Sequence, residues 1–466
     1  MQYFKPADST ESRFFVGDCM PFFHDGLFHL YYLRDENHHG ALGGLGGHQW
    51  AHASSSDLVT WTHHPLAIAL TNDWERSICT GSTFFHNRTY YGFYATRKAD
   101  WTQHLGLATS PDGVTFTKTE PNPLASPPAG YDPHHFRDPF VFWDDGTQLF
   151  HMLVTAMHED YPLYNLGGCL AHLTSPDLHG WTMASPFIVP GLPDAPECSD
   201  YFSWHGWYYL LFSNGLVTRY RMSRQPFGPW LRPKSDILDG PAMRVMKTAA
   251  FTGDRRIGAA WIGTREHDKD SGRFQWGGHA VFREIVQHDD GTLGTKFVPE
   301  MIPAPITAMT NTALTALPIT TRAQSSAHYV HLEASQSFEA ARISGIPNRA
   351  RIMMRIIPKN GSTLFGLRLK ANEATAALES GCDLIFRPLE NRVELLDQVI
   401  TCVNGLDQPF DLDIVFQDDI IDMCLAGQRC LINRLPEQRG QQLFLFAHYA
   451  DVVFDRIEVL VTRFDD

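Results

Sequence analysis

The 466-residue sequence contains no run of about 18 apolar residues, the length that suggests a membrane-spanning helix. The first residues, from Met1 to Asp8, also lack the apolar segment of a secretory signal. The eight cysteines are scattered and never occur with Cys-x-x-Cys spacing, a pattern typical of free thiols in a reducing compartment. These absences predict a cytoplasmic protein with no membrane partner.

Positive charge is also scarce. The 52 Asp and Glu residues outnumber the 38 Lys and Arg residues, which gives a formal net charge of −14. A surface of this sign repels phosphate backbones, so we expect no nucleic-acid partner, whereas an uncharged sugar is not repelled. With 43% hydrophobic and 12% aromatic residues, the sequence is that of a folded protein whose aromatic side chains suit both β-strands and sugar-ring stacking.

Helical periodicity is nearly absent from roughly the first 300 residues, where a short repeat takes its place. Each copy is a turn with Gly, Asn or Asp followed by aromatic and β-branched residues, which is typical of a hairpin turn and its strand. The five copies span residues 24–32, 86–94, 144–152, 204–212 and 253–261. A period of roughly 50–60 residues with several short strands is typical of a propeller blade. Five copies therefore predict a five-bladed β-propeller, with an irregular β-sandwich as the alternative.

The sequence pattern changes after the repeats. Residues 303–325 are rich in Pro and Thr, which is typical of a connector. Alternating segments at 350–357 and 410–416 then predict the antiparallel strands of a β-sandwich. We therefore predict an all-β chain with a five-bladed β-propeller catalytic domain at 1–305, a linker at 306–325 and a β-sandwich domain at 326–466.

Three carboxylates fall at nearly the same phase of the repeat. Asp18, Asp138 and Glu197 lie eight or nine residues before the glycine of the first, third and fourth turns, and the same phase falls near Thr80 and Lys247 in the other two copies. Equivalent positions in a propeller are related by rotation about its axis, so we expect the three acids at one rim of the central channel. Any one of them alone is more simply a turn former. Their joint placement favours glycosidic-bond hydrolysis, which requires two carboxylates in different protonation states.

The segments around these acids resemble glycoside hydrolase family 32, the invertases, inulinases and levanases. Phe136-Arg137-Asp138-Pro139 is similar to the family's Arg-Asp-Pro motif, and Glu197-Cys198 is similar to its Glu-Cys motif. Three further segments resemble family motifs: Gln49-Trp50-Ala51-His52-Ala53 with residues 56–61, Thr80-Gly81-Ser82, and Ala280-Val281-Phe282-Arg283-Glu284. The resemblance covers the propeller and, more loosely, the sandwich. It implies a propeller with a C-terminal β-sandwich and a glycosidase that cleaves fructofuranosyl linkages.

The resemblance also implies roles for the acids in a retaining, double-displacement reaction. Asp18 attacks the anomeric carbon of the fructosyl unit, Glu197 is the general acid and base, and Asp138 stabilises the transition state. The further candidates for substrate contacts are Arg137, which holds ring hydroxyls with Asp138; Trp50, Trp74 and Trp276, as stacking or wall residues or simply packed between blades; Gln49 and Ser82, as hydrogen-bonding residues; and His52. Because the carboxylates supply both acid and nucleophile, we expect no cofactor and no metal.

One motif departs from the family pattern. The family usually carries Asn-Asp-Pro-Asn around its nucleophile, whereas this sequence has Gly17-Asp18-Cys19-Met20. The expected partner is a fructose-containing saccharide, and this departure favours one other than sucrose, such as a fructooligosaccharide or a difructose dianhydride. The Gly- and His-rich segment 37–48 directly precedes the motif that begins at Gln49, so we expect it to form a rim loop of the pocket. Its His spacing is poor for a metal, and its glycines lack the strand–helix context of a dinucleotide site.

Two alternative functions stay open. An inverting, arabinofuranosidase-like propeller would hold its two carboxyl groups more than about 6.5 Å apart, against about 5–5.5 Å in a retaining enzyme. A non-catalytic sugar-binding propeller is the other alternative, should the altered loop disable Asp18. The sandwich carries no convergent acid or base set, and its sequence leaves three roles open: to cover the propeller, to complete the pocket rim or to form a homo-oligomer.

Overall fold

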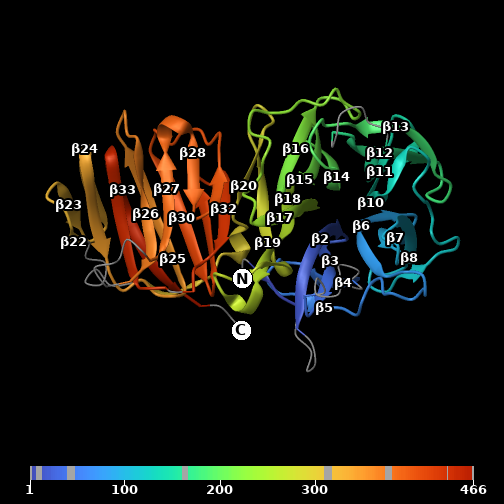
Figure 1. The fold of residues 1–466 in the computed structure, drawn as a ribbon, viewed down its shortest axis with the longest axis horizontal. Helices are drawn as coiled ribbons and strands as arrows, with labels where there is room; N and C mark the ends of the chain where they lie inside the picture. Colours follow the sequence, from blue (N-terminus) through green and yellow to red (C-terminus); the bar gives the residue numbers. More distant parts are fainter. Residues whose placement is uncertain are drawn as a thin grey trace.

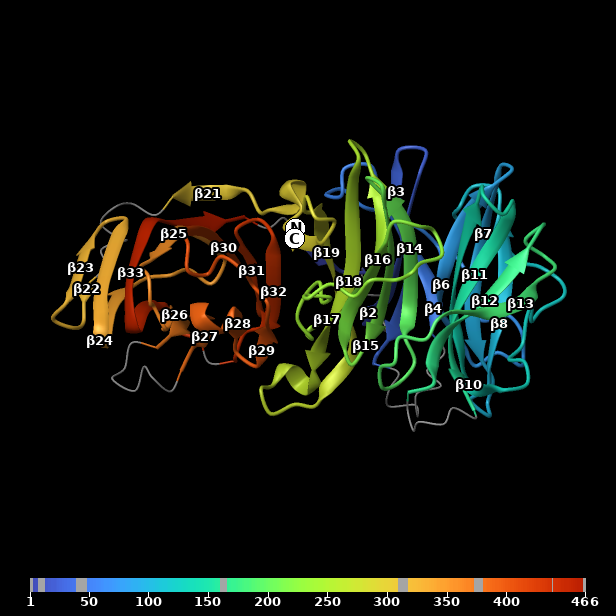
Figure 2. The ribbon, with the colours of Figure 1, turned by 90° about the horizontal axis from the view of Figure 1, so that it is seen from above.

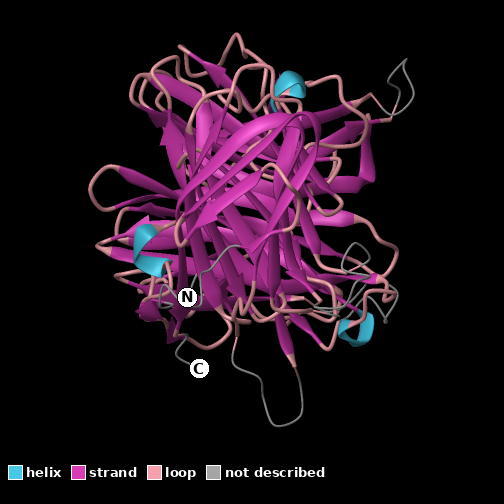
Figure 3. Cartoon of the chain, turned by 90° about the vertical axis from the view of Figure 1, so that its left-hand side faces the viewer, coloured by secondary structure: helices cyan, strands magenta, loops and turns pink. Residues whose placement is uncertain are grey.

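The structure, a computed structural model, describes residues 3–6, 13–38, 48–159, 166–308, 317–372, 380–437 and 439–463. Nearly all of its elements are β-strands (Figure 3), and the helical elements are the short 3-10 turns η2 (Glu266–Asp268), η3 (Pro299–Met301) and η5 (Pro388–Glu390). No helix within these ranges has the length and apolar character needed to cross a membrane. A propeller and a β-sandwich stand side by side (Figure 1), which confirms the predicted fold class.

Antiparallel sheets form the five blades of the propeller. The first blade contains β2 (Phe14–His24), β3 (Leu27–Glu36), β4 (Gln49–Ser55) and β5 (Thr62–His63). The second contains β6 (Ser77–His86), β7 (Thr89–Arg97), β8 (Gln103–Ser110) and β9 (Thr117–Lys118), and the third β10 (Tyr131–Asp144), β11 (Leu149–His158), β12 (Gly168–Ser175) and β13 (Thr182–Ile188). The fourth contains β14 (Glu197–Trp204), β15 (Trp207–Asn214) and β16 (Val217–Ser223). The fifth contains β17 (Met243–Phe251), β18 (Arg255–Arg265), β19 (Phe274–Gln287) and β20 (Leu293–Lys296), and β1 (Tyr3–Phe4) pairs with β19.

The first strand of each blade lies innermost. The strand β2 contacts β6, β6 contacts β10, β10 contacts β14, β14 contacts β17, and β17 contacts β2, so these five strands form a closed ring. In Figure 1 they surround the middle of the propeller. Groups at equivalent positions of the five strands therefore face a common axis, as expected for a propeller channel.

The sequence repeat forms the hairpin between the first and second strands of a blade. In the first copy the turn residues Asp25 and Gly26 have φ values of 50° and 78°, and in the fourth copy His205 and Gly206 have 46° and 76°. Positive φ at both central residues matches a type I′ turn, whose twist fits the flanking strands. The strand pairings that begin at these turns confirm the predicted hairpins.

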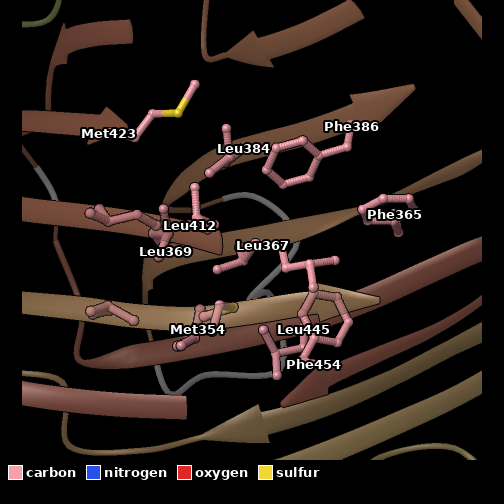
Figure 4. Packing of buried hydrophobic residues seen from close by; sticks show 14 of the residues in the cluster. Met354, Phe365, Leu367, Leu369, Leu384, Phe386, Leu412, Met423, Leu445 and Phe454 are labelled. Carbon is pink, nitrogen blue, oxygen red and sulfur yellow. The ribbon is translucent and has the colours of Figure 1, made fainter. Parts of the chain in front are cut away.

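The sandwich is organised around the long strand β33 (Gln442–Thr462), which pairs with strands of both layers. The other strands are β21 (Pro305–Ala308), β22 (Leu317–Pro318), β23 (Ala323–Ser326), β24 (Tyr329–Ile343), β25 (Ala350–Pro358), β26 (Leu364–Ala371), β27 (Cys382–Arg387), β28 (Arg392–Leu395), β29 (Gln398–Ile400), β30 (Phe410–Gln417), β31 (Ile420–Leu425) and β32 (Arg429–Arg434). In Figure 2, β25 and β30 lie in one layer and β26, β27 and β28 in the other. Buried side chains such as Phe365, Leu367 and Leu445 fill the space between the layers (Figure 4).

Strands of the sandwich sheet occupy part of the range predicted as a linker. The strand β21 pairs with β33, and β22 and β23 pair with β24. Proline is compatible with such short strands because it is tolerated at strand edges and at the first residue of a strand. Part of the 306–325 range thus contributes to the sandwich, and the exact domain limits stay a prediction.

A buried ion network joins the two domains. Arg283 of β19 donates from Nε to Asp239 (2.9 Å) and from both Nη atoms to the Asp422 carboxylate of β31 (2.8 Å each). All three side chains are buried. Burial raises the pKa of Asp422 to about 7, although Arg283 opposes the shift. The guanidinium therefore serves as the counter-charge of two acids at the domain interface.

Candidate active site

The first strand of every blade carries a β-bulge at an equivalent position. Pairing with the second strand shifts register between Val16 and Cys19, Ile78 and Gly81, Arg137 and Phe140, Glu197 and Asp200, and Arg244 and Lys247. A bulge leaves residues outside the ladder and re-aims their side chains. Asp18 and Asp138 lie within their bulges, and Glu197 is the last paired residue before its own. Because the five strands form a ring, the three acids face one region.

Asp18 is held at both carboxylate oxygens. The hydroxyl of Thr80 donates to Oδ2 (2.6 Å), and the indole Nε1 of Trp261 donates to Oδ1 (2.9 Å). Burial raises the pKa of Asp18 from 3.8 to about 6; the two hydrogen bonds lower it, and the nearby Asp138 and Glu197 charges raise it. The carboxylate is thus oriented, and it is mostly ionised at neutral pH.

Asp138 is buried, and its backbone adopts the left-handed region with φ of 56°. Its Oδ2 accepts hydrogen bonds from the backbone N–H of Cys198 (3.0 Å) and from the hydroxyl of Thr155 (3.1 Å), and the Nε of Arg137 lies 3.7 Å away. A non-glycine residue at positive φ carries backbone strain that surrounding contacts must hold, and such strain clusters at functional sites. Contacts from β11 and β14 fix the Asp138 carboxylate in this position.

Glu197 is the most accessible of the three acids, with 46% of its side chain exposed. The Nη2 of Arg137 donates to its Oε1 at 2.7 Å. Burial disfavours the charge of Arg137, yet the carboxylates of Asp138 and Glu197 together raise the pKa of its guanidinium above the usual value. Arg137 therefore links the two acids as a permanent cation.

The Cys198 thiol lies between two of the carboxylates. Its Sγ is 3.4 Å from Oδ2 of Asp138 and 3.7 Å from Oδ2 of Asp18. Burial, followed by the charges of Asp138, Asp18 and Glu197, raises the pKa of this thiol well above its usual value. A protonated thiol is a weak hydrogen-bond donor and not a competing nucleophile.

Lys247 supplies a buried cation at the corresponding position of the fifth blade. Its Nζ donates to the carbonyl oxygens of Gly81 (3.0 Å) and Ser199 (2.9 Å), and so connects the second, fourth and fifth blades. Burial lowers its pKa, although the acids around it favour the charged form. Both of these hydrogen bonds are to backbone carbonyls, which assigns Lys247 to holding the inner strands together.

The three acids, with Arg137 and Cys198, line one cavity of about 390 Å³. This volume is within the usual range for small-molecule sites. Acidic, cationic, imidazole and indole side chains line it: Asp18, Asp138, Glu197, Arg97, Arg137, His48, His134, His135, Trp101 and Trp276. Two larger cavities, of about 710 and 770 Å³, lie between the domains and contain none of the three acids. The chemistry therefore points to the smaller cavity. Among the described residues, no group of three or more His, Cys, Asp or Glu side chains is arranged to hold a metal ion.

The structure brings five of the sequence-predicted site residues to this cavity: Asp18, Asp138, Glu197, Arg137 and Trp276. Their roles in catalysis and binding stay predictions. The remaining five candidates do not line it.

Trp50 and Ser82 are structural in this fold. Trp50 is fully buried between the first two blades, and its Nε1 donates to the carbonyl oxygen of Cys79 (2.8 Å). The buried Ser82 hydroxyl accepts a hydrogen bond from the backbone N–H of Val141 (3.2 Å). Both side chains are satisfied by protein groups and neither lines the cavity. Trp50 takes the second of its two expected placements, packed between blades, and contact of either residue with a sugar stays a prediction.

His52, Gln49 and Trp74 also lie outside the cavity. His52 is buried in a stack with His64 and Tyr31, and burial lowers its pKa to about 2. Gln49 accepts a hydrogen bond through Oε1 from the Leu70 backbone (3.0 Å). Trp74 packs edge-on against His104 at 6.2 Å. None of the three is among the residues that line the cavity, and their contact with a sugar stays a prediction.

Sequence reasoning missed several residues of the cavity. The repeat phase pointed to the position of Thr80, but a threonine was not recognised as a partner of Asp18. Trp261 ends the fifth copy of the repeat, but nothing in that pattern marked it as a partner of Asp18. Trp101 had no sequence motif to mark it, although it has φ of 69°, is 40% exposed and carries Arg97 over its ring at 5.2 Å. Most of the expected rim loop at 37–48 lies outside the described residues.

The matches to known proteins centre on the propeller. The family model of the glycosyl hydrolases family 32 N-terminal domain matches residues 19–296, more than half of the chain, and begins one residue after Asp18. The chain is 30% identical over 209 residues to a levanase of Bacillus subtilis and 26% identical over 294 residues to a sucrose-6-phosphate hydrolase of Escherichia coli, which covers 39% and 57% of this chain. These matches span 28% and 58% of the two relatives, less than two thirds of either.

Two solved structures share the fold over nearly the whole chain. Fructan 1-exohydrolase IIa from Cichorium intybus has a TM-score of 0.75 at 17% identity, covering 99% of this chain and 96% of that one. Exo-inulinase from Aspergillus awamori has a TM-score of 0.70 at 16% identity, covering 99% of this chain and 98% of that one. At these identities the likeness concerns the fold.

Proposed function

The chain belongs to glycosyl hydrolase family 32, and we propose that it is a retaining glycosidase that cleaves a fructofuranosyl linkage. The observation that carries the proposal is the placement of Asp18 and Glu197 on one cavity in different surroundings. Asp18 is enclosed and hydrogen-bonded at both oxygens, whereas Glu197 is nearly half exposed. Glycosidic hydrolysis needs two carboxyl groups on one cavity, an ionised nucleophile and a protonated acid, and the family resemblance assigns these roles to Asp18 and Glu197.

In the proposed reaction, an Asp18 oxygen attacks the anomeric C2 of the fructosyl unit and forms a covalent fructosyl–enzyme. Glu197 gives a proton to the leaving oxygen in the same step. Glu197 then takes a proton from a water molecule, whose oxygen attacks C2 and releases both the fructosyl unit and the Asp18 carboxylate. Because Arg137 engages Oε1 of Glu197, Oε2 is the oxygen to which we assign the proton.

Asp138 and Arg137 are the proposed binders of the ring hydroxyls. Both line the cavity, and the buried hydrogen bonds of Asp138 keep its carboxylate oriented before a ligand arrives. Preorganised charge of this kind stabilises an oxocarbenium-like transition state without reorganisation during the reaction. The uncharged saccharide also fits a protein with a net charge of −14.

The proposed substrate is a fructoside other than sucrose, such as a fructooligosaccharide or a difructose dianhydride. In the unusual segment of β2, Cys19 and Met20 are buried, and their sulfur atoms contact the Ala260 carbonyl oxygen (3.5 Å) and the Gly81 amide (3.2 Å). These two side chains therefore pack the blades and make no polar wall. A related solved structure, a variant of fructan 1-exohydrolase IIa, is in complex with 1-kestose, which supports an oligofructoside as a substrate of this chain.

A cytoplasmic location is also part of the proposal. All eight cysteines are free, and seven of them are buried. Free buried thiols suit a reducing compartment. Fractionation of the native cells with an antibody to the chain tests this, and recovery from the medium would contradict it.

The decisive experiment is a panel of sucrose, 1-kestose, inulin, levan and difructose dianhydrides, with release of fructose or of the product saccharide as the readout. We expect cleavage of at least one fructoside, with proton NMR showing that the first-released anomer retains its configuration. Glu197→Gln should abolish turnover by orders of magnitude and keep binding, while Glu333→Gln, at an exposed position of the sandwich, should change neither. Binding without cleavage by the unmutated chain would indicate a sugar-binding propeller, and an inverted product an arabinofuranosidase-like mechanism.

A further inference from the structure

Gly17, the residue before Asp18, lies against the indole of Trp276. A Cβ atom at position 17 would lie 1.9 Å from Cη2 of Trp276 and 2.6 Å from Cζ2 and Cζ3, far inside contact distance. Gly17 lies within β2 and is not among the glycines with positive φ, so its backbone conformation would accept other residues. The close approach of the ring, and not the conformation, requires glycine here.

Trp276 also contacts the groups around Asp18. Its ring lies 5.2 Å from that of Trp261 at 56°, and Trp261 is the donor to Oδ1 of Asp18. It stacks on His48 at 4.4 Å and 25°. Trp276 and His48 both line the cavity. The indole thus forms a wall of the cavity that touches the backbone next to Asp18 and the side chain that orients it.

We propose that Trp276, whose ring fits here only because residue 17 has no side chain, determines which fructosyl unit the cavity accepts. This inference rests on the proposed function and names the substrate class of the same site. The indole presents carbon atoms where a side chain at position 17 would stand. A sugar hydroxyl that faces this wall loses water without gaining a hydrogen bond, which is unfavourable. A fructosyl unit whose oxygen there is already part of an ether linkage, as in a difructose dianhydride, avoids that loss and packs its C–H groups on the ring.

The specificity test measures binding in the Glu197→Gln background, so that no turnover is needed. Calorimetry with sucrose and with a difructose dianhydride should show tighter binding of the dianhydride, and Trp276→Ala should reduce this preference about tenfold or more. Trp276→Phe is a conservative control that keeps an aromatic ring and is less prone to misfold. It should retain most of the binding preference for the dianhydride. Trp143→Ala, at an exposed tryptophan of β10 outside the cavity, should leave it unchanged. A preference that survives Trp276→Ala in a folded protein would overturn the inference.

The close packing of Trp276 against Gly17 is tested by thermal unfolding, which does not depend on any ligand. Replacing glycine by alanine in an extended segment usually stabilises a protein slightly. Gly17→Ala should instead lower Tm by roughly 2 °C or more, because overpacking costs free energy. The loss should vanish in the Trp276→Ala background, and Gly180→Ala, where a Cβ would meet its nearest atom at 3.8 Å, should not lower Tm. Equal losses in both backgrounds would show that the two residues are not coupled.

Failure of this inference is distinguishable from failure of the proposed function. A chain that binds with the expected preference but cleaves no fructoside of the panel contradicts the proposed function alone. A chain that cleaves a fructoside of the panel, with a binding preference that Trp276→Ala does not alter, contradicts this inference alone.

Discussion

Replacing Thr80 by valine should move the acid limb of the pH profile of kcat/KM upward. Thr80 donates a 2.6 Å hydrogen bond to Oδ2 of Asp18, and this bond stabilises the ionised carboxylate. Burial already raises the pKa of Asp18 from 3.8 to about 6. Valine keeps the shape of the side chain and removes the donor, so the pKa-lowering effect of this hydrogen bond no longer offsets the pKa-raising effect of burial.

The magnitude follows from the strength of the lost bond. A hydrogen bond to a charged group contributes about 1.5–3 kcal/mol, and one pKa unit corresponds to about 1.4 kcal/mol, so the pKa should rise by about one to two units. As a nucleophile Asp18 must be ionised, and activity is therefore lost as the pH falls through its pKa. The acid limb should move from near pH 6 to between about 7 and 8.

The assay is kcat/KM as a function of pH on the fructoside that the panel identifies, because this ratio reports ionisations of the free enzyme. Trp261→Phe, which removes the 2.9 Å bond to Oδ1, should shift the limb in the same direction. Thr147→Val is the matched control, since this exposed threonine also donates to an aspartate, Asp144, far from the cavity. An acid limb that stays in place in both variants, or moves down, would show that Asp18 is not the group that must be ionised.

Three further predictions concern stability and substrate binding. The folded-state pKa of Asp18 is raised, so its ionised form destabilises the native state above about pH 6 and this cost disappears below pH 3.8. Asp18→Asn should therefore raise the free energy of unfolding at pH 7–8 by up to about 3 kcal/mol, with a smaller gain near pH 4. Urea denaturation at both pH values measures this free energy, and the absence of any gain would refute the prediction. Arg283→Ala leaves the buried Asp239 and Asp422 without their cation and should lower the free energy of unfolding by about 3–5 kcal/mol; a loss below about 1 kcal/mol would contradict the counter-charge role. Trp101→Ala should raise KM for 1-kestose with little change in kcat, because this exposed ring lines the cavity and suits stacking of a leaving sugar, and an unchanged KM would place it outside the binding path.

The blade pattern was predictable because its determinants are local. A turn such as Asp25-Gly26 needs only residues that tolerate positive φ, and the aromatic run after it needs only β-propensity. The repeat phase then placed Asp18, Asp138 and Glu197 together, since equal positions in equal blades are related by one rotation. The bulges in the five inner strands are the structural counterpart of that phase.

The positions of the tryptophans could not be predicted from the sequence. Trp50 belongs to a segment that resembles a family motif, but it is buried between blades. Trp101 belongs to no motif and lines the cavity, whereas Trp261 was marked only as part of the fifth repeat copy and holds Asp18. Strand alternation says which side chains leave a sheet on the same face, but not what the neighbouring blade brings to that face. Trp276 was a sequence candidate, although its fit against Gly17 was not foreseeable from residues 259 positions apart.

The sequence by itself determined the all-β architecture, the five-fold repeat and the carboxylates that share its phase, because turns and strands are specified by residues near one another in the chain. Only the tertiary structure decided how those carboxylates differ. Their burial, the Thr80 and Trp261 donors to Asp18, the Arg137 cation beside Glu197 and the indole that fills the Gly17 space come from different blades. Protonation and pocket shape depend on distances and desolvation between such remote groups, and these exist only once the ring of blades has closed.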